Sequence, residues 1–463
     1  MKTSSIARIM IAGTGSGCGK TTVTCAILKA LSNRRVKAAA FKCGPDYIDP
    51  MFHTEIIGIG SRNLDTFLCG ENNVKYLLAK NSQEAEVSVT EGVMGYYDGL
   101  GSDGSHSSYS ISRITGTPAI LVAEPGGMAL SVAAVIKGFK DFKSGSNLKG
   151  VILNSVSPAL YEMYKPMIED NTGLKLFGFL PHIPGAAIES RHLGLVTASE
   201  IVDIQRKLDV LAQNAEQYID IDGLLRLSQA APSIEYEPFT VKESCQCKIA
   251  VARDRAFCFY YADSLGLLEQ MGAKLIYFSP LKDKQLPEGI NGLILGGGYP
   301  ELYAKELSEN KSMLNSIKNA VEKGLPAYAE CGGFMYLQQS LTDAEGNKYA
   351  MAGALEGNNK MEKSLSRFGY TTLTAREDNL FCLKGESINA HEFHYSDSDN
   401  NGTGFEAFKP NNGKGWKCIV ANDTVVAGYP HMHFYGNIGF AERFVQKCSK
   451  FASQTNYNIK PEK

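Results

Sequence analysis

The feature that most restricts how this chain can fold is a glycine-rich run near the N-terminus that ends in Gly-Lys-Thr-Thr. It reads Gly13-Thr14-Gly15-Ser16-Gly17-Cys18-Gly19-Lys20-Thr21-Thr22 and lies between an expected strand at 8–12 and an expected helix at 21–32. Glycines let the backbone fold closely around phosphate oxygens with several N–H groups pointing inward. The N-terminus of the following helix also favours an anion. The run therefore predicts a phosphate-binding loop between a β-strand and an α-helix.

Individual residues of this loop have expected roles in nucleotide binding. Lys20 is expected to neutralise the β- and γ-phosphates, and the Thr21 hydroxyl to ligate Mg²⁺. Thr14 takes the place of the first Gly of the standard P-loop, which is a departure from the pattern. A plain glycine-rich turn is the alternative, and the strand–loop–helix context argues against it. The expected nucleotide-contacting residues are Thr14, Gly15, Gly17, Gly19, Lys20, Thr21 and Thr22.

Hydrophobic patterning extends the argument to the whole chain. Short apolar runs alternate with amphipathic stretches, which predicts βαβ units and parallel sheets with helices on both faces. The alternation fails between 228 and 247, where Pro232 and Pro238 occur, and then restarts. We expect two tandem three-layer α/β domains, at 1–235 and 248–445, joined by a linker at 236–247. Strands are expected at 8–12, 38–42, 87–90, 119–123, 150–153, 248–252, 274–278, 292–295 and 327–329, with helices at 21–32, 128–142, 260–271 and 308–323.

Composition excludes several classes of protein. The 463 residues are 44% hydrophobic, and their formal net charge of -2 argues against a nucleic-acid scaffold. No apolar stretch approaches the ~20 residues that a membrane span requires. The 11 cysteines are odd in number and form no C-x-x-C pair, so reduced thiols and a cytoplasmic location are expected. The polar C-terminal stretch from Ser449 is expected to be frayed.

Acidic residues follow the strands next to the loop. Asp46 and Asp49 follow the second expected strand, while Glu91 and Asp98 follow the third. Carboxylates at the carboxyl ends of parallel strands lie in the ligand crevice of such folds. Together with Thr21, they can complete a Mg²⁺ shell. Asp46 and Glu91 are favoured for this role, whereas Asp49 and Asp98 are equally consistent with forming turns.

These segments resemble the cobyrinate a,c-diamide synthase family, within the P-loop amidoligases. The matching stretches are the loop itself, Gly44–Pro50, Asn63–Asp65, Glu91–Gly99 and Ser190–Leu195. The resemblance implies that ATP phosphorylates a substrate carboxylate and that ammonia displaces the phosphate to give an amide. It further implies roles for individual residues: Mg²⁺ ligation by Thr21, Asp46 and Glu91, proximity to the activated carboxylate for Asp49 and Asp98, and adenine contact for Asn154.

The second half contains a candidate source of ammonia. Cys331 follows an apolar strand and precedes Gly332 at the start of a helical run, a setting that lowers the pKa of a thiol. Backbone N–H groups of Gly297 and Gly332 can face an oxyanion. A buried, unreactive cysteine is the alternative.

The partner base of Cys331 is expected far along the chain, in Gly428–Phe434. His431 is the favoured base, and His433, which points to the same face of an extended segment, can orient it. The region resembles the glutamine amidotransferase domain of the cobyric acid and cobyrinate diamide synthases, and His391–Ser396 matches it as well. Related class I enzymes have Glu where this chain has His433. The H-x-x-H of this stretch can also suggest a metal, although a structural or substrate-rim role is favoured.

Two other functions remain open at this point. The same chemistry can act on another tetrapyrrole, such as hydrogenobyrinate or a nickel sirohydrochlorin. A P-loop switch ATPase of the partitioning type is the alternative from a different class. The expected partners are small molecules, namely a tetrapyrrole polycarboxylate, glutamine and ATP, with no nucleic acid or membrane; a homodimer is possible.

Overall fold

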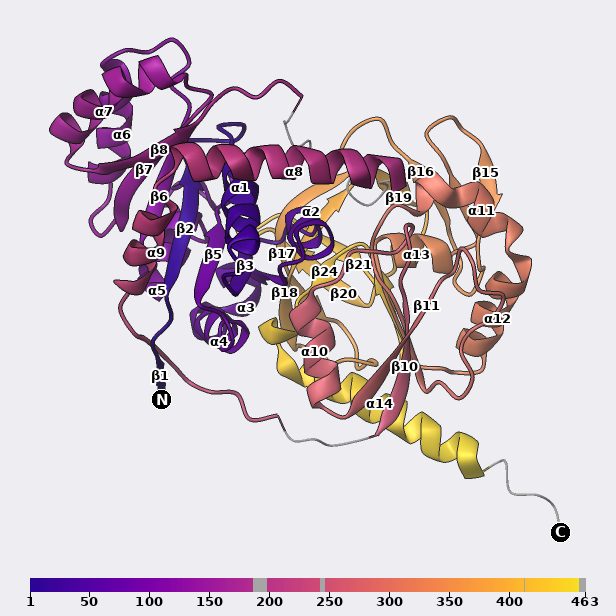
Figure 1. The fold of residues 1–463 in the computed structure, drawn as a ribbon. Coiled ribbons are helices and arrows are strands. Elements are labelled where there is room, and N and C mark those ends of the chain that lie inside the picture. Colours follow the sequence, from indigo (N-terminus) through magenta and orange to yellow (C-terminus); the bar gives the residue numbers. More distant parts are fainter. Residues whose placement is uncertain (186–197, 242–245, 412, 458–463) are drawn as a thin grey trace. The chain divides into compact units, whose positions relative to one another are not determined.

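The structure, a computed structural model, describes residues 1–185, 198–241, 246–411 and 413–457 (Figure 1). The chain divides into two compact units. Unit 1 comprises 1–66 and 70–239, and unit 2 comprises 67–69 and 240–463. The motif at 190–195 lies outside the described residues. No helix in the described part of the chain combines the length and apolar character needed to cross a bilayer.

Unit 1 is built on a seven-stranded parallel sheet. Apolar residues are buried on both faces of its central strands, as expected when helices cover both sides. In spatial order the strands are β4 (Ser61–Leu64), β3 (Ala38–Cys43), β5 (Val87–Glu91), β2 (Arg8–Gly13), β6 (Ala119–Ala123), β7 (Leu148–Asn154) and β8 (Lys175–Leu180).

The helices of unit 1 include α1 (Lys20–Asn33) and α8 (Ala198–Tyr218), which share a core with β2 and β5. Figure 1 shows α1 and α8 crossing in front of the sheet. The other helical elements are α2 (Ile48–Met51), the π-helix η1 (Phe52–Ile57), α4 (Glu71–Asn81), α5 (Ser108–Thr115), α6 (Ser131–Asp141), α7 (Pro158–Thr172) and α9 (Ile221–Gln229); α3 (Thr66–Cys69) spans the division between the units.

A short antiparallel pair closes unit 1 and corrects one expectation. β1 (Lys2–Ser4) pairs with β9 (Ile234–Tyr236), inside the stretch from 228 where the alternation was expected to fail. The buried Arg8 side chain helps to hold this end, because its guanidinium donates to the carbonyl oxygens of Thr115 and Pro232 at 2.5 and 2.6 Å. The first residue of the expected linker, Tyr236, is therefore the last residue of a strand.

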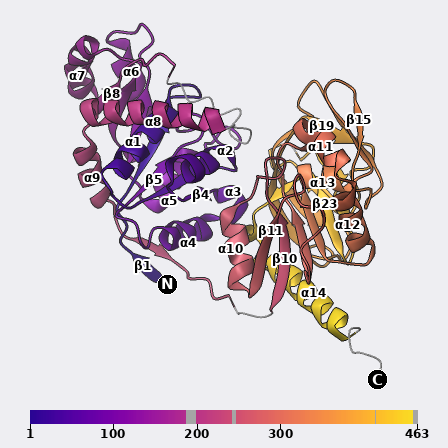
Figure 2. The same ribbon diagram turned by 45° about the vertical axis from the view of Figure 1, so that its right-hand side comes forward.

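Unit 2 contains a six-stranded sheet that is parallel except at one edge. Its order is β11 (Ala273–Phe278), β10 (Cys247–Ala252), β12 (Gly292–Leu295), β13 (Ala327–Glu330), β23 (Val425–Gly428) and β22 (Val420–Ala421). Figure 2 shows β10 and β11 side by side with α10 (Ala262–Gln270) next to them. The other helical elements are η3 (Pro300–Tyr303), α11 (Ala304–Glu309), α12 (Lys311–Glu322), α13 (Gly332–Leu337), η4 (Phe434–Gly436) and α14 (Ile438–Tyr457).

Several details of unit 2 differ from expectation. The helix expected at 308–323 is two helices, separated at Asn310, whose side chain donates to the Pro280 and Asp283 carbonyls instead of facing solvent. The stretch from Ser449 is not frayed along its whole length, since α14 continues to Tyr457.

Two further sheets of unit 2 were not expected. One is antiparallel, with β21 (Gly415–Cys418), β20 (Phe405–Phe408), β17 (Arg367–Ala375), β18 (Ser387–His394) and β24 (His431–Met432). The other is mixed, with β15 (Lys348–Ala350), β14 (Ser340–Thr342), β16 (Asn358–Met361) and β19 (Ser396–Ser398).

Candidate functional site

The glycine-rich loop of unit 1 joins β2 to α1, as the sequence predicts. Gly19 caps α1 with a left-handed φ of 91°, which places Lys20 at the first position of the helix. The Lys20 ammonium donates to the Gly15 carbonyl at 2.7 Å and so folds back over the loop. Burial lowers the pKa of Lys20, which favours an anionic partner for its charge.

The other expected nucleotide contacts line the same loop. A Cβ at Gly19 would lie 2.6 Å from Cγ of Asn154, so the side chain of Asn154, at the end of β7, packs directly on the loop backbone. The Thr14 amide donates to Val122 at 3.1 Å. The space beside Gly15 and Gly17 is open, because a Cβ added at either glycine would have no contact within 4 Å. Thr22 is half-buried in α1.

A buried cluster of charges lies beside the loop. The Lys42 ammonium, on β3, is 2.5 Å from Oδ2 of Asp49 and 2.9 Å from Oε1 of Glu91. The Thr21 hydroxyl donates to Oε1 of Glu91 at 2.6 Å. His53 Nε2 lies 3.3 Å from the other Glu91 oxygen. The structure thus brings together three of the predicted residues and adds two more.

The ionisation of this cluster follows from its burial and pairing. Burial alone would lower the pKa of Lys42, but the carboxylates of Glu91 and Asp49 raise it well above its usual value. Burial opposes the charge on Glu91, yet Lys42 and His53 hold the pKa of this carboxyl below its usual range. Burial and the neighbouring Glu91 charge raise the pKa of Asp49. Two carboxylates thus share one buried lysine.

Some oxygens of the cluster are of the kind that Mg²⁺ prefers, although the described residues contain no group of three or more His, Cys, Asp or Glu side chains arranged to hold a metal ion. Thr21 and Glu91 present oxygens at one point, and the buried Oδ1 of Asp49 has no hydrogen-bond partner among the described residues. Asp46 is near enough for its charge to raise the pKa of Lys42, although its Oδ1 also accepts from the Ile48 amide at 2.8 Å.

Asp98 has a local structural partner. Its Oδ2 accepts from the Gly95 amide at 2.8 Å, which closes the turn that contains both residues. This contact matches the turn-forming interpretation of Asp98. A role next to the substrate carboxylate stays a prediction.

In unit 2, Cys331 lies in a sharp turn between β13 and α13. Its backbone has φ 46° and ψ -103°, outside the region that a non-glycine residue ordinarily occupies. Such strain persists only where surrounding structure enforces it, and it concentrates at functional positions. Here the Cys331 amide donates to Gly428 and the Gly333 amide to Gly296, which fixes both ends of the turn.

The side chain of His431 hydrogen-bonds with that of Cys331, the partner that the sequence predicts for it. Burial disfavours a charged imidazole, but hydrogen bonds with the Cys331 and Glu330 side chains raise the pKa of His431 to about 10. Nδ1 of His431 is 3.3 Å from Oε2 of Glu330. Because Nδ1 faces Glu330, the other ring nitrogen is left for the thiol. The geometry suits a thiolate–imidazolium pair.

The two glycines expected near the oxyanion lie at this turn. A Cβ at Gly297 would be 2.7 Å from Cε1 of His431, so only glycine leaves room for the imidazole. A Cβ at Gly332 would lie 3.2 Å from the Gly298 amide nitrogen, which places the two backbone segments in contact. The loop that contains Gly297 and Gly298 therefore lies against the turn that follows Cys331.

His433 does not take the orienting position expected for it. The strand β24 ends at Met432, so the alternation that would place His431 and His433 on one face does not continue. Nδ1 of His433 accepts from the Tyr435 amide at 3.3 Å, and its ring lies 4.8 Å from that of Tyr261. Glu330 occupies the place beside His431 instead.

The two histidines of the H-x-x-H stretch also have separate surroundings. They are three residues apart in β18, so their side chains leave opposite faces of the strand. His394 stacks on Tyr429 with ring centres 3.9 Å apart, while His391 meets the edge of Tyr370. This arrangement matches the structural role favoured from the sequence.

Sequence reasoning missed Lys42, His53 and Glu330. A lysine inside an otherwise apolar strand, immediately before Cys43-Gly44-Pro45-Asp46, was a usable signal for Lys42. Glu330 directly precedes the nucleophile, but adjacent residues of a strand normally face opposite ways. Only the unusual backbone at Cys331 brings both side chains to one imidazole.

Comparisons with known proteins match a family to each half of the chain. Residues 9–195 match the "CobQ/CobB/MinD/ParA nucleotide binding domain" family, and residues 248–438 match the "CobB/CobQ-like glutamine amidotransferase domain" family. Similar full-length relatives are named cobyrinate a,c-diamide synthase. The protein of Caldanaerobacter subterraneus subsp. tengcongensis is 43% identical, over 96% of this chain and 98% of its own. The Clostridium tetani protein is 42% identical, over 95% and 99%. The chain belongs to the cobyrinate a,c-diamide synthase family, which joins a nucleotide-binding domain to a glutamine-hydrolysing domain.

Proposed function

We propose that the chain converts the a and c carboxylates of cobyrinate into amides, with ATP activating each carboxylate and glutamine supplying the nitrogen. The name shared by the relatives and the two matched families support this reaction. The observation that carries the proposal is that one chain holds a nucleophilic Cys331–His431 pair and a phosphate-binding loop with Lys20 and Thr21.

Unit 1 would perform the ATP-dependent step. A carboxylate reacts poorly with ammonia because its oxygen is a poor leaving group, and transfer of the γ-phosphoryl group to that oxygen corrects this. Lys20 would turn from the Gly15 carbonyl to the phosphates, where its charge offsets the repulsion between two approaching anions. Lys42 would offer a second positive charge close by.

Thr21, Asp46 and Glu91 would hold Mg²⁺, with Asp49 as the neighbouring carboxylate. When bound, the ion would supply charge neutralisation and orientation of the phosphates. Asp49 and Asp98 would lie near the carboxylate to be activated, and Asn154 would contact the adenine. The packing of Asn154 against the loop backbone supports this last role.

Unit 2 would release ammonia from glutamine. The Cys331 thiolate attacks the side-chain amide carbon, and backbone amides near Gly297 and Gly332 stabilise the oxyanion that forms. His431 then gives its proton to the departing nitrogen, which leaves as ammonia, and a thioester remains on Cys331. Water, deprotonated by His431, attacks the thioester and releases glutamate, which restores the thiolate.

The finer points of organisation belong to the same proposal. We assign the synthetase reaction to 1–235 and the glutaminase reaction to 248–445, with 236–247 as the linker. Reduced cysteines support a cytoplasmic location, and the ten cysteines in the described part of the chain are all free. A homodimer is testable by light scattering of the purified protein.

Mass spectrometry of the substrate tests the proposal directly. Incubation with ATP, Mg²⁺, glutamine and cobyrinate should replace two OH groups by NH₂ in succession. Cys331→Ser should abolish the glutamine-supported reaction but keep the reaction supported by ammonium chloride. Lys20→Ala should lose amide formation from either nitrogen source while glutamine hydrolysis persists in part. Glutamate release without any change in cobyrinate would refute the assignment of the substrate.

A further inference from the structure

Glu330 directly precedes the nucleophile and is the side chain that contacts the base. We propose that Glu330 is the positioning residue of the glutaminase site, holding the His431 imidazolium toward Cys331 in the place where His433 was expected. The inference rests on the proposed glutaminase function and adds a residue to it. It departs from the usual order, in which the orienting carboxylate follows the histidine in the chain.

The contacts of Glu330 are those of a fixed carboxylate. Oε2 lies 3.3 Å from Nδ1 of His431, while Oε1 accepts from the Met432 amide at 2.8 Å and from the Tyr328 hydroxyl. The His431 and Glu330 side chains are 4% and 9% exposed. Charge-assisted hydrogen bonds in such a setting are stronger than neutral ones. Three donors from three positions therefore determine the orientation of this carboxylate.

The backbone explains how neighbours in sequence can serve one imidazole. Glu330 ends β13 in register with Gly428 of β23, which brings it close to the residues that follow β23, and its carboxylate contacts His431 and Met432 there. The left-handed turn at Cys331 then rotates the next side chain back toward the same point. In a regular strand the two side chains would diverge. The strained φ of Cys331 thus lets two residues adjacent in sequence serve one imidazole.

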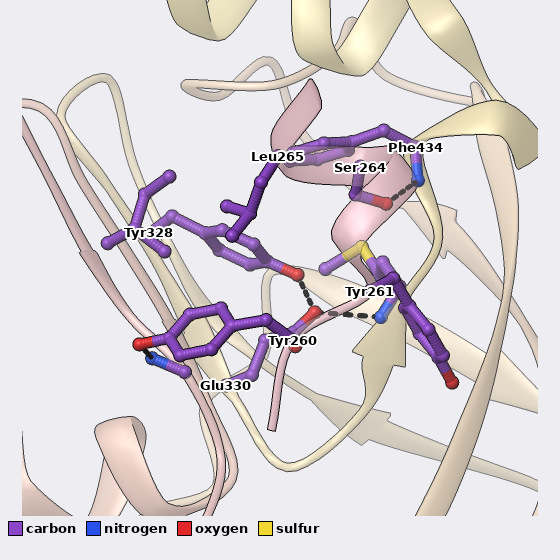
Figure 3. Close-up of a pocket in the computed structure, with 10 residues that line it drawn as sticks. Tyr260, Tyr261, Ser264, Leu265, Tyr328, Glu330 and Phe434 are labelled. Atoms are coloured by element: carbon purple, nitrogen blue, oxygen red, sulfur yellow. Dashed lines mark hydrogen bonds between the residues drawn. The ribbon is translucent and has the colours of Figure 1, made fainter. Parts of the chain in front are cut away.

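The surroundings of Glu330 are built to support it. Figure 3 shows the Tyr328 hydroxyl directed at Glu330 within a small cavity that Tyr260, Leu265 and Phe434 also line. The Tyr260 hydroxyl accepts from the Gly296 amide at 2.9 Å and donates to the Ala252 carbonyl. Two tyrosines that line this cavity therefore hold the site: Tyr328 contacts the Glu330 carboxylate, and Tyr260 contacts the glycine loop beside His431.

His433 lacks the properties that the role requires. Burial lowers the pKa of His433 to about 3, which favours a neutral ring at pH 7. A neutral imidazole cannot offset the positive charge that His431 carries. In addition, Nδ1 of His433 is engaged by the Tyr435 amide.

The test is the pH dependence of glutamine hydrolysis in Glu330→Gln. The amide keeps the size of the side chain and can still accept from Tyr328 and Met432, but it removes the charge. We expect kcat to fall on the order of 10²-fold, a loss typical of impaired proton transfer, with KM for glutamine changed less than about threefold. The alkaline limb of the kcat/KM profile should move down by at least about one pH unit, because His431 loses the partner that stabilises its charge.

Two further variants keep the result interpretable. Glu330→Asp retains a carboxylate and should recover part of kcat and of the alkaline limb. His433→Asn keeps an acceptor for the Tyr435 amide. The alkaline limb of its kcat/KM profile should lie at the same pH as in the wild type. Amidation supported by ammonium chloride should be unchanged in all three, and the fluorescence transition of Trp416, which lies in unit 2, should match that of the wild type, which shows that both units are folded.

The inference would be overturned by a wild-type kcat and pH profile in Glu330→Gln, or by a displaced limb in His433→Asn alone. It would also be overturned if Glu330→Asp were no better than Glu330→Gln. Failure of the proposed function would look different, because the wild-type protein itself would then not hydrolyse glutamine.

Discussion

Replacing Lys42 by Met should destabilise unit 1 by an amount that increases with pH. Lys42 is the shared cation of two buried carboxylates, with its ammonium 2.9 Å from Glu91 and 2.5 Å from Asp49. At an effective dielectric constant of about 20, a pair at the first distance attracts by about 6 kcal/mol. Desolvation offsets part of this attraction, and removal of one partner from a buried pair costs about 3–5 kcal/mol.

Protonation of a carboxyl sets a second limit on how far Lys42→Met can destabilise unit 1. Without Lys42, one carboxyl can be neutralised by taking up a proton, which costs about 5 kcal/mol at pH 8 and about 2 kcal/mol at pH 6 for an ordinary pKa near 4.3. The destabilisation should therefore be about 3–5 kcal/mol at pH 8 and no more than about 2 kcal/mol at pH 6.

The contribution of Glu91 to the pH dependence of stability reverses sign between the two proteins. In the wild type the pKa of Glu91 lies below its unfolded value, so its contribution to stability is present above the unfolded pKa and is lost as pH falls through the folded pKa. In Lys42→Met the folded pKa should exceed the unfolded one. The free energy of unfolding then falls as the pH rises from the unfolded pKa of this carboxyl to its folded pKa, and it is constant above the folded pKa.

Amide hydrogen exchange of peptides that cover β3 and β5 measures this free energy within unit 1 alone. Trp416, the single tryptophan, lies in unit 2, and its fluorescence transition should not change. Lys29→Met removes a half-exposed pair with Asp209 at 3.2 Å in unit 1 and should cost less than about 1 kcal/mol. A cost for Lys42→Met below about 1 kcal/mol, or one independent of pH, would refute a charged, buried cluster.

Three other outcomes follow from the same geometry. Gly19→Ala should raise KM for ATP at least about tenfold, because φ +91° and the contact with Asn154 leave no room for a methyl group; steady-state kinetics with ammonium chloride checks this, and an unchanged KM would contradict it. Gly297→Ala should lower kcat for glutamine hydrolysis by about tenfold or more, since the methyl group would meet the His431 ring at 2.7 Å, whereas Gly266→Ala, with open space around it, should be neutral. Wild-type glutamine hydrolysis should remain active up to about pH 9 and decline as pH passes the His431 pKa of about 10, and a decline near pH 7 would show that this imidazole is not stabilised as a cation.

Local patterns in the sequence predicted most elements that position the two sites. The phosphate-binding loop, Cys331 and His431 were identifiable because each lies in a short segment whose residue types and neighbours carry the chemistry. Strands of unit 1 were recognisable because they are buried on both faces and read as continuous apolar runs. The antiparallel strands of unit 2 alternate between buried and exposed residues, and they are interrupted by polar turns, so no long apolar run marked them.

The orienting carboxylate was not predictable for a different reason. Sequence reasoning placed His433 beside His431 by assuming an extended strand through both residues, and the strand ends one residue too early. The meeting of Glu330 and Cys331 at one imidazole depends on one backbone angle, the positive φ of Cys331, and on the register between β13 and β23. Neither quantity is encoded by a local pattern, because both are set by tertiary packing around the turn.

The distribution of charge explains why overall composition carried so little information about function. Both substrates of the ATP-dependent step are anions, yet the formal net charge of the chain is -2. In each unit the decisive charges are instead buried and shared: Lys42 serves two carboxylates, and His431 serves a thiol and a carboxylate. A buried charge acts strongly on its neighbours because water does not screen it. One lysine or one imidazole placed in this way can outweigh many surface residues, so the net charge of the chain need not reflect the charge of its substrates.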